Sequence, residues 1–337
     1  MRRLLGILVT IVVAIPAIIL TWPGFFHLER TFPLAQIISF RTIVVLVLGA
    51  LLVVCLLLAL ARPMRALMLA FAVVFAVTAG VGGFILLQRG VGSNQLPSPT
   101  DTSLRIMTWN TAGTATSAQV IAQTAVAMSA DVVTLPETTV DTGEAVAVAM
   151  RNLGRPMWVH HTTLGPWAAD STTILISPEL GDYSVIESSA DGSSNTSTVP
   201  SAVAMPIDGK GPTIVAAHAV APRQEDIQHW RDDLQWLADQ CAGGNVIMAG
   251  DFNATLDHMT GLGTDGGTLG DCRDAAAATG NGAVGTWPTS LPELVGAPID
   301  HVMATPNWKA TGSIVLDALD DSGSDHRPLV VQLEPAG

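Results

Sequence analysis

Three long apolar segments near the N-terminus constrain this chain more than any other feature of its sequence. They cover residues 4–20, 43–60 and 66–87, and none of them contains a charged side chain. Each is close to the roughly 20 helical residues needed to cross the hydrocarbon core of a bilayer. We therefore expect a membrane domain over residues 1–90 with three transmembrane helices.

The first apolar segment has a second interpretation, as a cleavable signal peptide. Arg2 and Arg3 precede it, and it contains the small residues Ala14 and Ala17, as signal peptides do. A charged loop and two further apolar segments follow directly, which favours a retained helix. We expect this segment to stay in the protein.

Basic residues beside the apolar segments predict their orientation, because loops rich in Lys and Arg stay in the cytoplasm. Arg2 and Arg3 precede the first segment, and Arg62 and Arg65 lie in the short turn between the second and third. We expect a multi-pass plasma-membrane protein with a cytoplasmic N-terminus and an extracytoplasmic domain after the third segment. Three arginines at the opposite ends weaken this bias: Arg30, Arg41 and Arg89.

The remainder of the chain is strongly acidic. Of the 29 carboxylates only Glu29 precedes residue 100, which leaves 28 against nine Lys and Arg, a formal charge of −19. Proteins that bind nucleic acid neutralise several phosphates with Lys and Arg. The charge therefore disfavours a long polyanion as substrate, unless metal ions or a local basic patch compensate.

Residues 91–103, which include Pro97 and Pro99, predict a short linker that lifts the acidic domain, residues 104–337, off the membrane. Short apolar runs then alternate with turn residues, and strands outnumber helices. We expect an α/β fold, a four-layer sandwich of two packed, mainly antiparallel sheets flanked by helices. The expected strands are 104–109, 131–135, 172–176, 201–207, 213–218, 245–249, 299–304 and 327–333, and the expected helices are 117–128, 225–239 and 272–278.

Polar side chains follow these apolar runs where the strands are expected to end. Strand ends carry loops that a rigid scaffold can bring to one cleft. Separate segments could therefore build one site, completed by Asp300, Asp325 and His326. The residues that follow the runs are Asn110, Glu137, His218, Asp251 and Asn253.

Six motifs carry a resemblance to a known family. They are Met107-Thr-Trp-Asn110, Leu135-Pro-Glu137, Ala217-His218, Ala249-Gly-Asp-Phe-Asn-Ala254, Ile299-Asp300 and Ser324-Asp-His-Arg-Pro328. One Gly-Asp-x-Asn is a weak signal, but six motifs in order are specific. From residue 104 to 333 the sequence resembles the endonuclease/exonuclease/phosphatase superfamily, metal-dependent phosphoesterases that include deoxyribonuclease I and bacterial sphingomyelinases.

The resemblance implies a metal site. Glu137 would be the principal ligand of Mg²⁺, or of Mn²⁺ in its place, helped by Asn110 and Asp325. Carboxylate and amide oxygens suit these hard cations, which also bind phosphate oxygen. Taken alone, Glu137 could equally be a solvated turn residue after Pro136.

The resemblance also implies catalytic roles for five residues. Asp251 would orient or deprotonate the attacking water, and Asn253, two residues along an extended segment, would donate to the phosphoryl oxygens. His326 would stabilise the developing charge, with Asp300 orienting its imidazole, and His218 would bind phosphate from the other side. Taken alone, Asp251 and Asn253 could form an Asx turn.

Several positions leave the roles open or depart from the family pattern. Ala112 stands where nucleases of the family carry a second acidic ligand, so inference of a nuclease substrate is unsafe. His301 should point away from Asp300 because side chains alternate along a strand. Trp287 could line a cleft, although core packing is the expected role. Cys241 and Cys272 could form a disulfide or remain two buried thiols.

Together these features predict a membrane-anchored, divalent-metal-dependent phosphoesterase that acts on a lipid-linked or small phosphoester at the extracytoplasmic face. The bilayer and the phosphoester are the expected partners, and nucleic acid is disfavoured by charge. One alternative is an extracytoplasmic nuclease in which metal ions offset the negative field. Another is a non-catalytic membrane sensor or scaffold, against which the joint presence of all the polar site residues argues.

Overall fold

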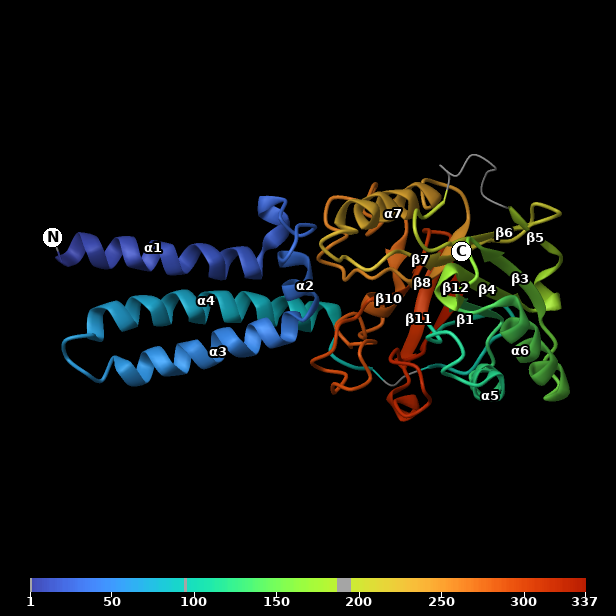
Figure 1. The fold of residues 1–337 in the computed structure, drawn as a ribbon, viewed down its shortest axis with the longest axis horizontal. Coiled ribbons are helices and arrows are strands. Elements are labelled where there is room, and N and C mark those ends of the chain that lie inside the picture. The colour runs from blue at the N-terminus through green and yellow to red at the C-terminus, as the bar shows by residue number, and fades with distance from the viewer. Residues whose placement is uncertain (1, 94–95, 187–194) are drawn as a thin grey trace.

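A computed structural model describes residues 2–93, 96–186 and 195–337, in which an elongated helical part leads into a two-sheet domain (Figure 1). The helical part contains α1 (Arg2–Thr21), α3 (Arg41–Leu58) and α4 (Arg65–Arg89). All three are long and apolar enough to cross a membrane. α4 packs along both other helices, and small or apolar side chains such as Ala17, Cys55 and Phe75 are buried between them.

Two six-stranded sheets pack face to face in the second part, with strand orders β11-β12-β1-β2-β4-β3 and β5-β6-β7-β8-β10-β9. Each sheet contains one parallel pair, β1 with β2 and β7 with β8, and the other neighbouring pairs are antiparallel. The strands are β1 (Leu104–Thr108), β2 (Val132–Pro136), β3 (Trp158–Thr163), β4 (Ser171–Ile176), β5 (Tyr183–Ile186), β6 (Ala202–Pro206), β7 (Thr213–His218), β8 (Val246–Asp251), β9 (Arg273–Asp274), β10 (Asp300–Ala304), β11 (Trp308–Val315) and β12 (Leu329–Pro335).

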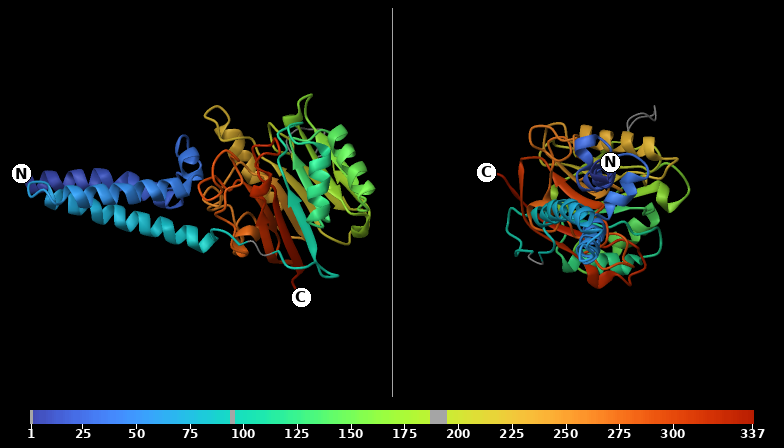
Figure 2. Two further views of the ribbon diagram at one scale, coloured as in Figure 1. Left: turned by 90° about the horizontal axis from the view of Figure 1, so that it is seen from below. Right: turned by 90° about the vertical axis from the view of Figure 1, so that its left-hand side faces the viewer.

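Alternation of side chains along the strands separates an inner core from two outer ones. Ile106 and Ile247 point between the sheets, whereas Met107 packs under α5 (Ala118–Ala127) and α6 (Val140–Asn152). Met248 packs under α7 (Ile227–Gln240) on the opposite outer face. Helices therefore cover both sheets, as Figures 1 and 2 show, and the expected four-layer α/β sandwich is confirmed. Short helices complete the fold: Pro23–Phe26, α2 (Leu34–Ser39), Ala168–Asp170, Pro178–Leu180, α8 (Ala275–Ala278) and Asp317–Leu319.

The expected helix over 272–278 is confirmed only for its last four residues. Arg273 and Asp274 pair with β10 instead, and only four alanines form α8. Cys272 is held outside this helix by a disulfide to Cys241 at the end of α7. The sequence also did not predict α6 or the edge strands β3, β5 and β11, because Gly143 interrupts the apolar pattern of α6 and these strands mix polar and apolar residues.

The segment after α4 packs against the two-sheet domain and does not hold it away from the helices. The backbone N–H of Gly282 donates to the carbonyl oxygen of Arg89 at 2.9 Å, and that of Ala283 donates to Gly90 at 2.9 Å. A Cβ at Gly90 would lie 2.2 Å from the backbone of Gly280, so only glycine allows this approach. The start of the expected linker docks as well, because the N–H of Gly92 donates to the carbonyl oxygen of Gly280 at 3.1 Å and that of Ser93 donates to Oδ1 of Asn281 at 2.8 Å.

The loop between α1 and α3 also docks on the two-sheet domain. It contains α2, whose Ala35 is fully buried in the core beneath α7 with Trp230 and Phe252. The imidazole Nε2 of His258 lies 3.0 Å from the carbonyl oxygen of Ala35, and Gln36 donates to that of Pro222. The helical part thus completes the core of the two-sheet domain.

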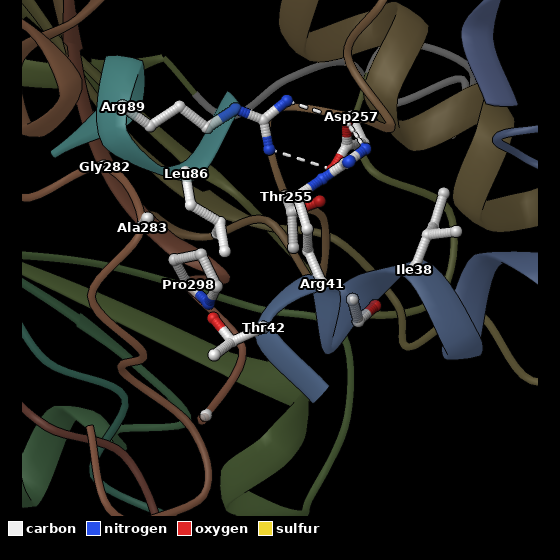
Figure 3. A pocket seen from close by; sticks show the side chains of 12 residues that line it. Ile38, Arg41, Thr42, Leu86, Arg89, Thr255, Asp257, Gly282, Ala283 and Pro298 are labelled. Carbon is white, nitrogen blue, oxygen red and sulfur yellow. Dashed lines mark hydrogen bonds and ion pairs between the residues drawn. The ribbon is translucent and has the colours of Figure 1, made fainter. Parts of the chain in front are cut away.

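An ion cluster joins the two parts at the same junction (Figure 3). Arg41, at the start of α3, and Arg89, at the end of α4, both place two guanidinium nitrogens on the carboxylate of Asp257, at 2.5 to 2.9 Å. Burial would raise the pKa of Asp257, but the charges of Arg89 and Arg41 outweigh it and hold that pKa well below its usual range. The junction is therefore fixed by a buried, bidentate charge cluster.

Candidate active site

Three neighbouring strands of the second sheet place polar side chains side by side at one edge. In the parallel pair of β7 and β8, His218 lies opposite Asp251, and in the antiparallel pair of β8 and β10, Asp251 lies opposite Asp300. Gly250 allows the close approach of β7, because a Cβ there would lie 1.9 Å from the carbonyl oxygen of Ala217. All three polar side chains are buried.

His326 lies between the two facing carboxylates. Its Nδ1 is 2.9 Å from Oδ2 of Asp300, and its Nε2 is 3.7 Å from Oδ2 of Asp251. Two carboxylates directly opposite each other on adjacent strands would repel, so an imidazolium between them stabilises the arrangement. Asp300 and His326 form a hydrogen-bonded pair, and the backbone carbonyl oxygen of His326 accepts a hydrogen bond from the indole N–H of Trp109 at 2.8 Å.

The first sheet contributes Asn110 and Glu137, which follow β1 and β2. The amide nitrogen of Asn110 donates to Oε1 of Glu137 and to Oδ2 of Asp251, both at 3.0 Å, so it connects the two sheets. Glu137 has a φ of 56°, a left-handed conformation that is unfavourable for this residue. Strain of this kind concentrates at functional sites, which supports a role beyond that of a solvated turn.

Asn253 reaches Asp251 through a turn and not along an extended strand. β8 ends at Asp251, and Asn253 has a φ of 47°. Its backbone N–H donates to Oδ1 of Asp251 at 2.8 Å, which is an Asx turn. Its side-chain amide donates to the carbonyl oxygen of Ala219 at 3.0 Å and to Oδ2 of Asp251 at 3.3 Å. In this arrangement Asn253 orients Asp251.

The pKa values of the buried groups differ in direction. Burial lowers the pKa of His218 to about 3, and the charge of His326 adds to this effect, so His218 is neutral. Burial also opposes a charge on His326, but Asp300 and Asp251 outweigh it and raise its pKa. Burial raises the pKa of Asp251, Asp300 adds to the rise, and His326 opposes it. The site therefore holds an imidazolium beside a carboxylate of raised basicity.

The donor atoms fit a hard divalent cation. Carboxylates outnumber the one imidazolium here, so a phosphate would be repelled unless a cation were also bound. Side-chain atoms of Asp251, Asp300 and His326 lie within 4.8 Å of one another, but Oδ2 of Asp300 and Nδ1 of His326 are already paired. Glu137 is the better oxygen ligand, and Asn110 would join it by turning toward the cation the side-chain oxygen that accepts the N–H of Ala112 at 3.0 Å. Asp325 is exposed, and its Oδ2 accepts a hydrogen bond from the indole of Trp287 at 2.9 Å.

Residues 107–326 match the sequence profile described as the Endonuclease/Exonuclease/phosphatase family, over more than half of the chain. The chain belongs to this family. Members of the family are generally metal-dependent hydrolases of phosphoesters, and the cluster just described is a possible metal site. No curated protein matches the chain in sequence.

Solved structures of the endonuclease/exonuclease/phosphatase family share the fold. An endonuclease/exonuclease/phosphatase from Beutenbergia cavernae is 19% identical, with a TM-score of 0.53 over 70% of this chain and 72% of that one. A family protein from Leptotrichia buccalis is 13% identical, with a TM-score of 0.53 over 68% and 99%. D. rerio TDP2, complexed with single strand DNA product, is 17% identical, with a TM-score of 0.51 over 69% and 100%.

Two contributors to this family site were missed or misjudged from the sequence. Trp287 was expected in the core, but it is partly exposed, contacts Asp325 and lies with its ring centroid 6.0 Å from that of Phe40. Ser324 donates to the carbonyl oxygen of Asn110 at 2.6 Å and accepts the N–H of His326 at 3.0 Å. Ser324 belongs to the motif Ser324-Asp-His-Arg-Pro328, so the sequence could have indicated its role, whereas no local pattern indicates a contact between Trp287 and Asp325.

His301 follows Asp300 but points to the other side of the sheet, as strand alternation predicts. Its Nδ1 lies 2.6 Å from Oδ2 of Asp274, and its Nε2 lies 2.8 Å from the carbonyl oxygen of Ala254. Both partners are acceptors, so both ring nitrogens donate. Burial lowers the pKa of His301, but the hydrogen bond to Asp274 and its charge outweigh burial, and the pKa is raised.

We expect the His301–Asp274 pair to make stability decrease as the pH rises. A group whose pKa is raised on folding contributes fully below its unfolded value, about 6.5, and its contribution is lost as the pH rises through the folded pKa. The melting temperature of wild type minus that of His301→Gln should therefore be larger at about pH 6 than at about pH 9. Thermal unfolding at each pH measures this difference in melting temperature. His229→Gln, at an exposed position on α7, is the control, and its difference from wild type should not change in this way. A difference independent of pH would contradict the charge assignment.

Proposed function

We propose that this protein is a membrane-anchored phosphoesterase that hydrolyses a lipid-linked or small phosphoester at the extracytoplasmic face. The convergence of Asn110, Glu137, Asp251, Asp300 and His326 at one edge of the two sheets is the observation that carries this proposal. Mg²⁺ is the proposed cation, held by Glu137 and Asn110 with Asp325 beside them. When bound, it would neutralise phosphoryl oxygens and position the phosphate.

In the proposed reaction a water oxygen attacks phosphorus, a new P–O bond forms, and the bond to the leaving oxygen breaks. Asp251 accepts the proton of the water, a task helped by its raised pKa. His326, charged and held through Nδ1 by Asp300, directs Nε2 at a phosphoryl oxygen. Neutral His218 can donate one further hydrogen bond, and Asn253 can do so by giving up its longer bond to Asp251.

We infer an extracytoplasmic active site from Arg2, Arg3, Arg62 and Arg65, which lie at the ends expected in the cytoplasm. The three opposing arginines have roles in the folded protein: Arg41 and Arg89 share Asp257, and Arg30 pairs with Glu29 at 3.1 Å. A membrane-impermeant thiol reagent should therefore label a Ser98→Cys variant in intact cells. Labelling only after the cells are opened would reverse the orientation.

A nuclease remains the second candidate, since the D. rerio TDP2 structure holds single strand DNA product and shares this fold. The formal charge of −19 after residue 99 argues against a polynucleotide here.

A substrate screen with the purified full-length chain in detergent tests the proposal. Lipid phosphoesters, nucleotides, aryl phosphates and plasmid DNA are offered with Mg²⁺, with Mn²⁺ and with a chelator. We expect metal-dependent hydrolysis of lipid or small phosphoesters and no comparable cleavage of DNA, with Glu137→Ala inactive. Strong cleavage of plasmid DNA that Asp251→Ala abolishes would favour the nuclease. No hydrolysis of any class would favour the scaffold.

A further inference from the structure

A cleft of about 610 Å³ opens beside the proposed active site, at the junction with the membrane part. This volume lies within the range of small-molecule sites, roughly 300–1,000 Å³. Two of its lining residues contact the site directly, because Asn253 donates to Asp251 and Trp287 donates to Asp325. The cleft therefore borders the proposed site.

The opposite wall of the cleft comes from the loop between α1 and α3. Phe32, Gln36, Ser39 and Phe40 line it, so the cleft does not exist without the membrane part. Phe32 is 45% exposed, and the ring centroids of Phe40 and Trp287, which both line the cleft, are 6.0 Å apart. This wall therefore adds two aromatic side chains beside a site for phosphate, while Arg223 and Glu225 line other parts of the cleft.

A second hollow, of about 620 Å³, continues from Phe40 into the helical part. It is a groove between α1 and α3, and its lining contains only apolar side chains, such as Val12, Leu20, Val47 and Leu51. Along α1 it runs from Val12 to Leu20, about 12 Å at 1.5 Å per residue. Phe40 lines both hollows, so they adjoin at this residue and form a path that is apolar in the α1–α3 groove and mixed in the cleft, where Arg223 and Glu225 also line it.

We propose that this path binds the hydrocarbon tail of a lipid phosphoester substrate, with its phosphate at Asp251 and His326 and its tail in the α1–α3 groove. The inference rests on the proposed function and names its substrate class. A polynucleotide or a short phosphoester would leave Phe32, Phe40 and Trp287 facing water, whereas a hydrocarbon chain would bury them. A substrate held in this way does not have to leave the bilayer completely to reach the catalytic residues.

The test uses a series of 4-nitrophenyl alkyl phosphates and alkyl phosphates that differ only in chain length, from ethyl to decyl. The full-length protein in detergent is assayed, and kcat/KM for the decyl ester is divided by that for the ethyl ester. Val47→Trp fills the groove. Val53→Trp is the matched control, because Val53 is on the same helix and similarly exposed, 56% against 52%, but does not line the groove.

We expect the wild-type ratio to exceed tenfold, about the effect of two buried methylenes, and Val47→Trp to lower it by about tenfold. In Val53→Trp the ratio should stay within about twofold of wild type. Partitioning of long chains into detergent affects both variants equally, so it cannot produce this difference. Val12→Trp fills the groove from the α1 side and replaces Val47→Trp if that variant does not fold.

The outcomes separate the inference from the function on which it rests. Hydrolysis with a ratio near one, or an equal ratio in the groove variant and in Val53→Trp, overturns the tail groove and leaves the phosphoesterase standing. Failure of the wild type to hydrolyse any ester in the series, with metal present, overturns the proposed function itself.

Discussion

Replacing Asp251 with asparagine is expected to lower kcat by about 10³-fold or more with little change in folding. Asparagine has the same shape and its one side-chain oxygen can still accept the backbone N–H of Asn253, although the hydrogen bond from Asn110 to Oδ2 is lost. It cannot accept a proton from the attacking water or balance the charge of His326. The measurement is kcat for the best substrate of the screen, with purified full-length protein and saturating metal.

Asp208→Asn is the control for this variant. Asp208 lies in the exposed turn between β6 and β7, whereas the site is at the other end of β7. The Asp208→Asn variant should therefore retain wild-type kcat. Thermal unfolding of Asp251→Asn checks that the protein is folded. A loss of less than tenfold in a folded Asp251→Asn variant would remove this residue from the chemistry.

Replacing Asp257 with alanine is expected to destabilise the protein by about 3–5 kcal/mol. The variant leaves the guanidinium groups of Arg41 and Arg89 buried together without their counter-charge. For a domain of this size, such a loss lowers the melting temperature on the order of 10 °C. Thermal unfolding of the full-length chain in detergent provides the measurement.

The triple variant Asp257→Leu, Arg41→Leu, Arg89→Met is the control, because it removes all three charges together. Apolar replacement of a complete buried cluster is often neutral, so most of the stability should return.

The stability that the wild-type cluster contributes should also decrease at acid pH. The pKa of Asp257 is lowered on folding, so its contribution is present above the unfolded value, about 3.9, and is lost as the pH falls through the folded pKa. An Asp257→Ala variant as stable as wild type would contradict the stabilising role of the charge cluster.

The strands that carry the site could be predicted because each of them is a short apolar run that stops at a polar residue. In the structure β7 ends at His218 and β8 ends at Asp251, so each strand ends at the polar residue that follows its apolar run. The facing of Asp251 and Asp300 could not be predicted, because strand register depends on contacts far apart in sequence. The extended geometry assumed for Asn253 was wrong, since a left-handed turn residue has no clear signal when it is not glycine.

The junction between the two parts was the main feature that the sequence did not predict. Arg41 and Asp257 are 216 residues apart, and Arg30 contacts the backbone of His258 across 228. Hydropathy correctly identified apolar helices, but it treats the loop between them only as a connection. Composition likewise suggested a spacer before residue 104, whereas Gly90 has no side chain and so allows the chain to dock.

The burial of Ala35 in the core beneath α7 has a consequence for how such an enzyme is confined in the cell. A protease that cut the chain before β1 would release a fragment without Ala35, without both partners of Asp257 and without one wall of the cleft. If the protein is the membrane-anchored phosphoesterase that we propose, we expect shedding to inactivate it and to give no active diffusible form. Its action would then be restricted to the membrane that holds the intact chain.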